Sequence, residues 1–251
     1  MMVIPQVTSG GLTSFLVLIA ALALLLLFAA RARRGRRPHV RPLPAFDQLP
    51  SELGKGAEAG APLHLGLGSG GVGGNQTLTS LGGLEVLAGF ADAAVAYGVP
   101  PVVTVGDPTL LPLAQDIVRR ASIRRGVPER YDPTTVRFIA SSPYVYALGA
   151  SDVMGQERVI ANVLVGSFGE EVALLTHGGE ERAMTQMAAA DRLRALGVLY
   201  PADALLAAGE ELYAGGARLT GLPRYLASLS TQDVLRFLLV LVILLRVLGV
   251  F

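Results

Sequence analysis

One uncharged stretch, residues 12–30, determines how the rest of the chain can be placed relative to a membrane. It reads LTSFLVLIAALALLLLFAA, and as a helix rising about 1.5 Å per residue it would span roughly 28 Å, the thickness of a bilayer core. No charged side chain precedes it, and five arginines follow at once: Arg31, Arg33, Arg34, Arg36 and Arg37. The positive-inside rule predicts that residues 1–11 lie outside, that residues 12–30 cross the plasma (inner) membrane, and that the following domain is cytoplasmic. A cleaved signal peptide is the weaker alternative, because its positive charges would come first.

The arginine cluster has two interpretations, contact with anionic lipid headgroups or binding of nucleic acid. Its position directly beside the apolar run favours contact with lipid. Each arginine near an anionic membrane surface contributes about 1 kcal/mol of electrostatic attraction. Residues 42–231 hold 13 basic and 19 acidic side chains, so the part of the chain behind the cluster would repel a phosphate backbone. We expect a lipid bilayer as a partner, and no nucleic acid.

A second apolar run, residues 234–251, reads VLRFLLVLVILLRVLGVF and is interrupted by Arg236 and Arg246. Both arginines stand near an end of the run, where a long side chain can reach the interface, so a second membrane crossing is favoured. On a helical wheel Asp233 shares one sector with the two arginines. Two alternatives therefore stay open for residues 232–251: a helix that lies in the interface, or a helix whose polar stripe faces a membrane protein partner or another copy of the chain.

The segment between the arginines and the first predicted strand is rich in proline and glycine and shows no sustained apolar period. Such a composition is typical of a linker. We predict a basic and Pro/Gly-rich linker over residues 31–61, with one helical turn near Asp47 to Leu53.

From residue 62 to residue 231, short apolar runs alternate with longer stretches of helical period, which is typical of βα units and a parallel sheet. Five runs are expected to be buried strands: residues 63–67, 102–105, 136–140, 159–165 and 185–190. Asp107 with Pro108, and Ser142 with Pro143, each pair an N-cap residue with proline at the first helical position. The predicted fold class is α/β, a three-layer Rossmann-like sandwich with about five mainly parallel strands, plus terminal transmembrane helices.

The composition excludes several classes of site. The chain has no cysteine, three histidines and one lysine, so disulfide scaffolds, cysteine-ligated metal centres and thiol chemistry are ruled out. A histidine-rich metal site is disfavoured for the same reason, and we expect no metal. The only lysine, Lys55, lies in the predicted linker, and GxxxxGK[ST] does not occur, so a P-loop triphosphatase is excluded.

The loop after the first predicted strand is dense in glycine. Residues 66–77 read GLGSGGVGGNQT, which fits GxGxxG in two registers. Glycine lets backbone N–H groups approach a phosphate closely, and the following helix adds a partial positive charge. A dinucleotide site also needs an acidic residue after the second strand, usually about twenty positions on; the nearest is Asp107, which lies much farther along the chain than that. The alternative is a turn that only tightens strand-to-helix packing.

In an open α/β sheet, a ligand binds at the carboxyl ends of the strands. The candidate ligand-binding residues are the glycine loop and the polar residues that follow the other predicted strands: Gly66, Gly68, Ser69, Gly70, Gly71, Gly73, Asn75, Thr77, Asp107, Ser141, Ser142, Ser167 and Asp191. None of them is a histidine or lysine, so a general base near neutral pH would have to be Asp107 or Asp191. Residues 166–169 read GSFG and do not fit GxSxG. We assign no catalytic residue, and the cofactor is unknown.

Several stretches resemble an uncharacterised family of bacterial membrane-anchored proteins, known only as a domain of unknown function, with a glycine-rich α/β domain. The likeness covers roughly residues 45–240 and is carried by PLHLGLGSGGVGGNQTLTSLGGLE, PPVVTVGDPTLLPLAQD, ERVIANVLVGSFGEEVALL, GEELYAGGARL and STQDVLRFLLV. The resemblance implies membrane attachment and assigns no activity. The segment 185–192 departs from the pattern because it is poor in β-branched residues. This departure weakens the prediction of a fifth strand and of Asp191 as a site residue.

These patterns favour a membrane-anchored cytoplasmic α/β domain that acts as a binding, sensing or scaffolding module rather than as an enzyme. One alternative is a protein or enzyme that binds a nucleotide or another small anionic phosphate ligand through residues 66–74. A further alternative is a subunit of a larger membrane complex, including a homo-oligomer.

Overall fold

The computed structural model describes residues 9–33, 42–202 and 204–248. It divides into two units. Residues Pro42–Thr220 form an α/β domain, and the helices α1, Ser9–Arg33, and α10, Pro223–Val247, form the second unit.

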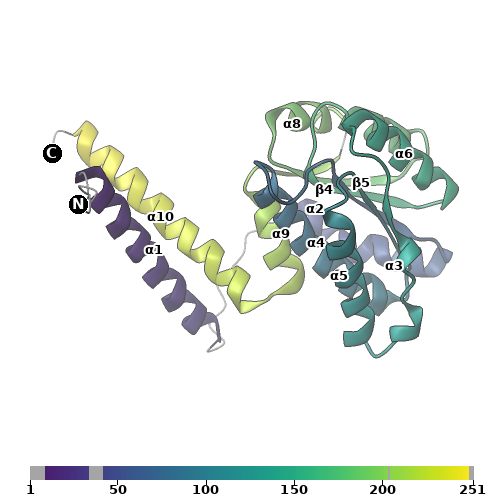
Figure 1. Ribbon diagram of the computed structural model, residues 1–251, viewed down its shortest axis with the longest axis horizontal. Helices are drawn as coiled ribbons and strands as arrows, with labels where there is room; N and C mark the ends of the chain where they lie inside the picture. Colours follow the sequence, from purple (N-terminus) through teal and green to yellow (C-terminus); the bar gives the residue numbers. More distant parts are fainter. Residues whose placement is uncertain (1–8, 34–41, 203, 249–251) are drawn as a thin grey trace, which may run out of the picture. The chain divides into compact units, whose positions relative to one another are not determined.

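Six parallel strands form the sheet of the α/β domain, in the order β3-β2-β1-β4-β5-β6 (Figure 1). Their bounds are β1 Leu63–Gly68, β2 Pro101–Val105, β3 Val136–Phe138, β4 Ala161–Ser167, β5 Thr185–Ala190 and β6 Leu205–Ala208. The predicted parallel α/β fold is confirmed, and each of the five expected strands is present. The pattern does not reveal β6, because its four residues, LLAA, include no β-branched side chain.

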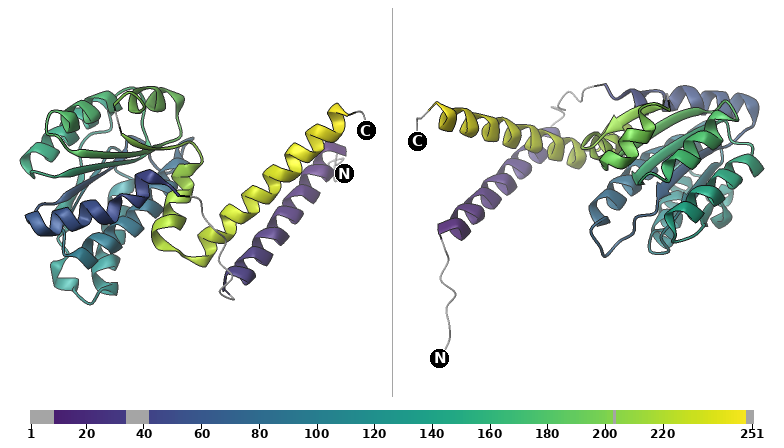
Figure 2. Two further views of the ribbon diagram at one scale, coloured as in Figure 1. Left: turned by 180° about the vertical axis from the view of Figure 1, so that it is seen from behind. Right: turned by 90° about the horizontal axis from the view of Figure 1, so that it is seen from above.

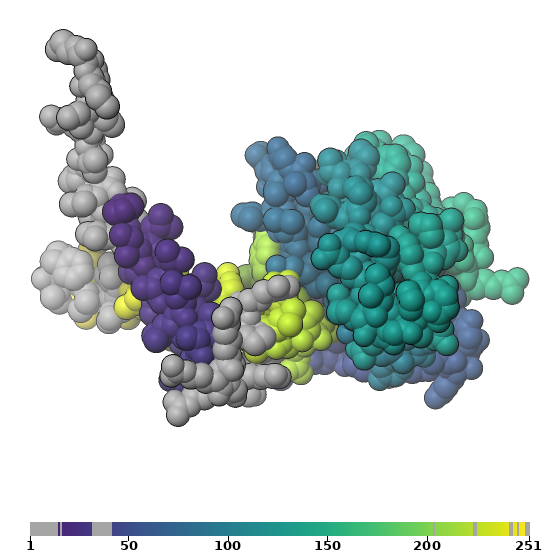
Figure 3. Space-filling model, turned by 60° about the horizontal axis from the view of Figure 1, so that its bottom comes forward, coloured from purple at the N-terminus to yellow at the C-terminus, as the bar shows by residue number. Residues whose placement is uncertain are grey.

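Helices cover both faces of this sheet and give three layers (Figure 2). One buried cluster joins the sheet to Leu53, Leu87 and Ala114 on one face, and the other joins it to Tyr146 and Leu175 on the opposite face. The helices of the domain are α2 Pro44–Asp47, α3 Leu49–Ala59, α4 Thr77–Tyr97, α5 Leu110–Arg124, α6 Pro143–Gln156, α7 Val172–Glu180, α8 Leu193–Leu199 and α9 Glu211–Thr220, with 3-10 turns η1 Pro128–Arg130 and η2 Pro133–Thr135. The segment around α5 forms much of the surface turned forward in Figure 3.

The predicted linker is wrong for residues 42–61. They form α2 and α3, and Leu43, Phe46 and Leu53 are buried in the core. Pro44 occupies the first turn of α2, where its missing N–H costs nothing, and Gly60 ends α3 in the left-handed conformation. Pro44 and Gly60 are therefore helix boundaries rather than marks of an unstructured connection, and Gly54 and Gly56 lie inside α3. Residues 34–41 lie outside the described residues.

The domain boundary near residue 231 is also different from the expectation. The α/β domain ends at Thr220, and α10 begins at Pro223, eleven positions before the apolar run at residue 234. Pro223 stands in the first helical turn and Leu222 at the N-cap is extended, which is the arrangement that proline favours at a helix start.

The two terminal helices lie side by side and run in opposite directions (Figures 1 and 2). The structure therefore gives the C-terminal helix a neighbour within its own chain. Arg31 and Arg33 fall in the last turn of α1, whereas Arg34, Arg36 and Arg37 lie outside the described residues. Large apolar side chains of both helices are exposed, among them Leu18 and Leu26 of α1 and Phe237 and Leu239 of α10.

By length and hydropathy alone, one helix among the described residues could cross a membrane, and it is α4. Most of its residues are buried in the α/β domain, as expected of a core helix. The apolar part of α1 that meets the hydropathy criterion within the described residues, Val17–Arg31, is shorter.

Candidate functional site

The order of the strands reverses between β1 and β4, and two loops meet at this point. From β1 the chain moves outward to β2 and β3, whereas the later strands extend from β4 on the other side. Gly68 at the end of β1 faces Ser167 at the end of β4, and the N–H of Ser69 donates to the carbonyl oxygen of Ser167 at 3.1 Å. Open α/β sheets bind ligands at such a reversal point, outside the carboxyl ends of the strands.

Two glycines allow the strands to approach each other here. Gly68 has φ +75°, and a Cβ at this position would overlap the carbonyl oxygen of Ser167. Gly166 has φ +141°, and its Cβ would overlap the carbonyl oxygen of Leu67. Both positions need glycine for conformation and for space. The glycine-rich composition of this region is therefore partly a packing requirement.

Gly70 adjoins two buried hydroxyls, and the next residue, Gly71, adjoins the carboxylate of Asp107. Among the described residues the N–H of neither glycine has a hydrogen-bond acceptor, in contrast to the N–H of Gly68 or Ser69. A Cβ on Gly70 would stand 2.7 Å from Cβ of Ser167 and 3.0 Å from Oγ of Ser80. Both serines are 1% exposed, and neither hydroxyl has a partner in the described part of the chain. Buried polar groups are normally hydrogen-bonded, so this cluster has unused hydrogen-bonding capacity.

The same cluster lies at the start of α4, a helix of 21 residues. Its N-cap residue, Gln76, makes no side-chain cap hydrogen bond. The first N–H groups of a helix lack intrahelical acceptors and carry a partial positive charge. The helix end therefore places a partial positive charge beside this cluster.

Asp107 packs directly against the glycine loop. A Cβ on Gly71 would overlap its carboxylate, which accepts from the N–H of Thr109 at 2.8 Å and from the Thr109 hydroxyl. The hydroxyl oxygen of Thr109 in turn accepts from the N–H of Val72 at 3.0 Å. The N-cap prediction is wrong for Asp107, since α5 begins at Leu110 with Thr109 at its N-cap. The carboxylate instead closes the turn after β2 and ties that turn to the glycine loop.

Thr77 closes the outer part of the loop. Its hydroxyl oxygen accepts from the N–H groups of Gly73 and Gly74, at 2.9 and 3.1 Å, and donates to the Gly74 carbonyl at 2.7 Å. Asn75 is exposed. The described contacts give Thr77 a structural role and leave Asn75 at the surface.

Asp191 directly follows β5, the strand that the sequence pattern supports least. One carboxylate oxygen accepts from the hydroxyl of Thr79 on α4, which also lies 3.4 Å from the phenol oxygen of Tyr213. The other carboxylate oxygen is buried and has no partner among the described residues. Asp191 therefore contacts the first turn of α4, next to Ser80.

Ser141 and Ser142 lie farther from this point. They follow β3, the outermost strand on one side, and both are exposed. Ser142 stands at the N-cap of α6 with Pro143 in the first turn, as predicted, but its side chain makes no cap hydrogen bond. Within the described chain no hydrogen bond joins either side chain to the glycine loop. Gly66 lies inside β1, where a Cβ would stand 2.9 Å from the Tyr146 phenol oxygen.

A buried chain of hydrogen bonds supports the base of the loop. Burial lowers the pKa of His64 to about 4 and raises that of Tyr146 to about 12, so the imidazole is neutral and the phenol keeps its proton. His64 Nδ1 lies 2.7 Å from Asn162 Oδ1, and its Nε2 lies 2.8 Å from Thr104 Oγ1. Thr104 Oγ1 lies 3.0 Å from Tyr146 Oη, which accepts from the N–H of Gly68 at 3.3 Å.

The direction of these hydrogen bonds follows from Asn162. Its Oδ1 can only accept, so His64 Nδ1 carries the proton and Nε2 accepts from the Thr104 hydroxyl. The Tyr146 hydroxyl then donates to Thr104 and receives the N–H of Gly68. This chain links three strands, β1, β2 and β4, and one helix, α6, to Gly68 at the start of the turn.

Sequence reasoning does not identify Ser80, Thr79, Thr104 or Tyr146. The available signal for the first two is the hydroxyl-rich start of α4, TLTS, directly after the glycine loop. Tyr146 and Thr104 give no comparable signal, because their contacts join residues that lie far apart in the sequence.

No curated protein and no solved structure matches the chain. A family model described as a domain of unknown function, DUF6754, matches residues 6–250. This match covers the α/β domain together with both terminal helices, and it confirms the resemblance to a domain of unknown function. The chain belongs to the DUF6754 family.

Proposed function

We propose that this chain is a membrane-anchored binding module whose α/β domain holds a nucleotide where the strand order reverses. The observation that carries the proposal is the pair of buried hydroxyls, Ser80 and Ser167, without hydrogen-bond partners among the described residues. They stand beside Gly70, whose N–H has no acceptor among the described residues, and close to the start of α4, whose N-cap residue makes no side-chain cap hydrogen bond. Together these donors suit a phosphate group.

The position of Asp107 supports a nucleotide over a free phosphate. A ribose needs an acceptor for its hydroxyls, and dinucleotide folds supply it from an acidic residue at the end of the second strand. Asp107 stands there, two residues after β2, with its carboxylate against Gly71. Its distance from the glycine loop in sequence reflects the length of α4, which occupies 21 of the intervening residues.

The flanks of the loop suit the remaining part of a nucleotide. Val72 is 39% exposed and Leu78 is 72% exposed, so both offer apolar surface to a base. The two carboxylates at this edge are both engaged within the domain, Asp107 with Thr109 and Asp191 with Thr79. Binding rather than turnover is therefore the function that the geometry supports best.

Ser80→Ala and Ser167→Ala test the proposal. Removing a buried hydroxyl that has no partner should leave the free protein as stable or more stable. The full-length chain would be screened by thermal unfolding with AMP, ADP, ATP, GTP and NAD. We expect one of these nucleotides to stabilise the native chain by about 2 to 3 kcal/mol at a hundredfold excess over its dissociation constant, and either alanine variant to lose this gain.

A matched control comes from the same loop. A Cβ on Gly74 would meet no atom within 4 Å, so Gly74→Ala should bind as the native chain does, whereas Gly70→Ala should bind less well. A screen without any stabilisation, or alanine variants that respond to nucleotide as the native chain does, would refute nucleotide binding at this site.

The membrane part of the proposal rests on the terminal helices. Their exposed apolar side chains, such as Leu18, Leu26 and Phe237, form more apolar surface than a soluble chain normally leaves to water. Lipid would cover this surface, with the arginines after α1 on the cytoplasmic side. Sodium carbonate extraction of membranes should leave the full-length chain in the pellet, and its release into the supernatant would exclude a membrane-spanning anchor.

A further inference from the structure

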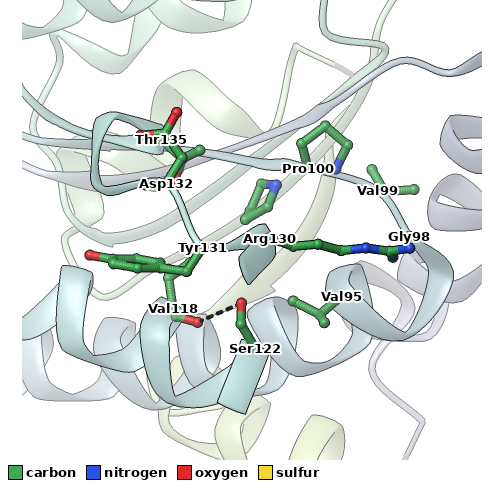
Figure 4. A pocket seen from close by; sticks show the side chains of 11 residues that line it. Val95, Gly98, Val99, Pro100, Val118, Ser122, Arg130, Tyr131, Asp132 and Thr135 are labelled. Carbon is green, nitrogen blue, oxygen red and sulfur yellow. Dashed lines mark hydrogen bonds between the residues drawn. The ribbon is translucent and has the colours of Figure 1, made fainter. Parts of the chain in front are cut away.

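A cavity of about 270 Å³ lies at the opposite edge of the sheet from the glycine loop. It is formed where α4 ends and β2 begins, between the end of α4, the middle of α5 and the 3-10 turns η1 and η2 (Figure 4). Val95, Val99, Pro100 and Val118 line it with apolar surface, and the ring of Tyr131 adds a flat wall. Such a site is separated from the glycine loop by the length of β2, about 17 Å for five residues.

Arg130 is the one cationic side chain that lines this cavity, and it differs from the arginines around it. Among the described residues its guanidinium makes no ion pair or hydrogen bond, and it extends toward Gly98 at the end of α4 (Figure 4). The neighbouring arginines of α5 and its C-cap are all paired with carboxylates: Arg119 and Arg120 with Asp116, and Arg124 and Arg125 with Asp92.

The nearest carboxylate in the cavity wall does not neutralise Arg130. Asp132 accepts from the N–H of Thr134 at 2.8 Å and from its hydroxyl at 2.7 Å, which caps η2. These two hydrogen bonds keep the pKa of Asp132 below its ordinary value, so it stays ionised in that role. The cavity thus combines apolar walls with one exposed guanidinium that makes no ion pair or hydrogen bond among the described residues, and with the ionised carboxylate of Asp132 engaged at η2.

We propose that this cavity binds a small carboxylic acid with an apolar body, held by its carboxylate on Arg130. Guanidinium is the side chain best suited to bidentate recognition of a carboxylate. The volume exceeds the cavity of about 150 Å³ that holds benzene and falls just short of the smallest drug-sized pockets, near 300 Å³. One aromatic ring or a short branched chain fits this range, so the ligand is a monocarboxylate rather than a nucleotide.

The competing role for Arg130 is purely structural, since a cation near the end of α4 also complements the carbonyl groups of that helix. The two roles differ in their dependence on ligand charge. If Arg130 serves only the helix, the cavity should bind an acid and its neutral amide with equal affinity.

The test uses 4-fluorobenzoate and 4-fluorobenzamide as probes of equal shape, titrated into the full-length chain in a nonionic detergent and followed by fluorine NMR. We expect the native chain to bind the acid at least tenfold more tightly than the amide. Arg130→Gln should remove this preference, and Arg130→Lys should retain part of it. Arg120→Gln is the matched control, because that arginine is exposed and pairs with Asp116 outside the cavity, and it should change nothing.

Val118→Phe would fill the cavity and should abolish the binding of both probes. Equal affinities for acid and amide, an acid preference that survives Arg130→Gln, or the absence of saturable binding would each overturn the proposal. Its failure is distinguishable from that of nucleotide binding, because Ser80→Ala and Ser167→Ala should bind 4-fluorobenzoate as the native chain does.

Discussion

Lowering the pH from 6.5 toward 4 should destabilise the α/β domain through His64. The side chain belongs to the second residue of β1 and is 0% exposed, and both ring nitrogens lie within hydrogen-bond distance of buried partners, Asn162 and Thr104. Burial lowers the pKa of His64 from 6.5 to about 4 in the folded chain. Between these two values the unfolded chain binds a proton at this residue and the folded chain does not.

The sign and size of the effect follow from this difference. Because the unfolded state binds more protons, the free energy of unfolding rises with pH across this window and falls as the pH is lowered. A shift from 6.5 to about 4 corresponds to on the order of 3 kcal/mol. A loss of this size is a large part of the stability of an ordinary domain, which is about 5 to 15 kcal/mol.

Urea unfolding of the full-length chain at a series of pH values between 4 and 7, followed by the near-ultraviolet tyrosine signal, would measure this dependence. His64→Gln keeps a hydrogen-bonding side chain that does not titrate, so its free energy of unfolding should change less over the same range. The difference between the two curves isolates His64 from the acidic residues, which titrate in both proteins. His177→Gln removes an exposed histidine of α7 and serves as the control. Parallel curves for the native chain and His64→Gln would refute the reasoning.

Two further predictions concern the core and the glycine turn. Leu53→Ala should lower the free energy of unfolding by about 2 to 5 kcal/mol, because Leu53 of α3 is 0% exposed. The control, Leu81→Ala on the exposed side of α4, should change the free energy of unfolding little. Equal urea midpoints for the two variants would show that residues 42–61 do not belong to the core. Gly68→Ala should cost at least about 1 to 2 kcal/mol from its left-handed backbone alone, with a further cost from overlap with the Ser167 carbonyl, and Gly74→Ala in the same loop should be nearly neutral by the same measurement.

The sheet could be predicted because its strands are buried on both faces. Each residue of β1, β2 and β4 is buried, so these strands appear in the sequence as short, mostly apolar runs, with buried polar exceptions such as His64, Thr104 and Asn162. The edge strand β6 is only partly buried and reads as LLAA, which carries no such signal.

The helices in residues 42–61 are difficult to predict for a different reason. Proline and glycine are abundant both in linkers and at helix ends, and only the contacts of Phe46 and Leu53 with the core distinguish the two.

The site could be predicted only in part. The rule that ligands bind at the carboxyl ends of parallel strands brings residues 66–74, Ser167 and Asp107 to one edge, and the structure places them in contact. Strand order decides which strand ends are neighbours, and order is not written in any local pattern. The rule therefore groups Ser141 and Ser142 with the glycine loop, although β2 separates β3 from β1 in the sheet. Ser80 becomes visible only when burial and hydrogen bonding are known together.

The arrangement of the terminal helices makes a topological prediction that separates the alternatives for α10. Since α1 and α10 run in opposite directions, a chain that crosses the bilayer with both helices has its two ends on the same side and the α/β domain on the other. The chain has no cysteine, so a single introduced cysteine is the only thiol and can be labelled without background. Val3→Cys and Val250→Cys should both react with a membrane-impermeant maleimide in intact cells. Ser51→Cys, exposed in the α/β domain, should react only after permeabilisation. If Val250→Cys also required permeabilisation, α10 would lie along the interface instead of crossing, and if Ser51→Cys reacted in intact cells, the proposed orientation would be wrong.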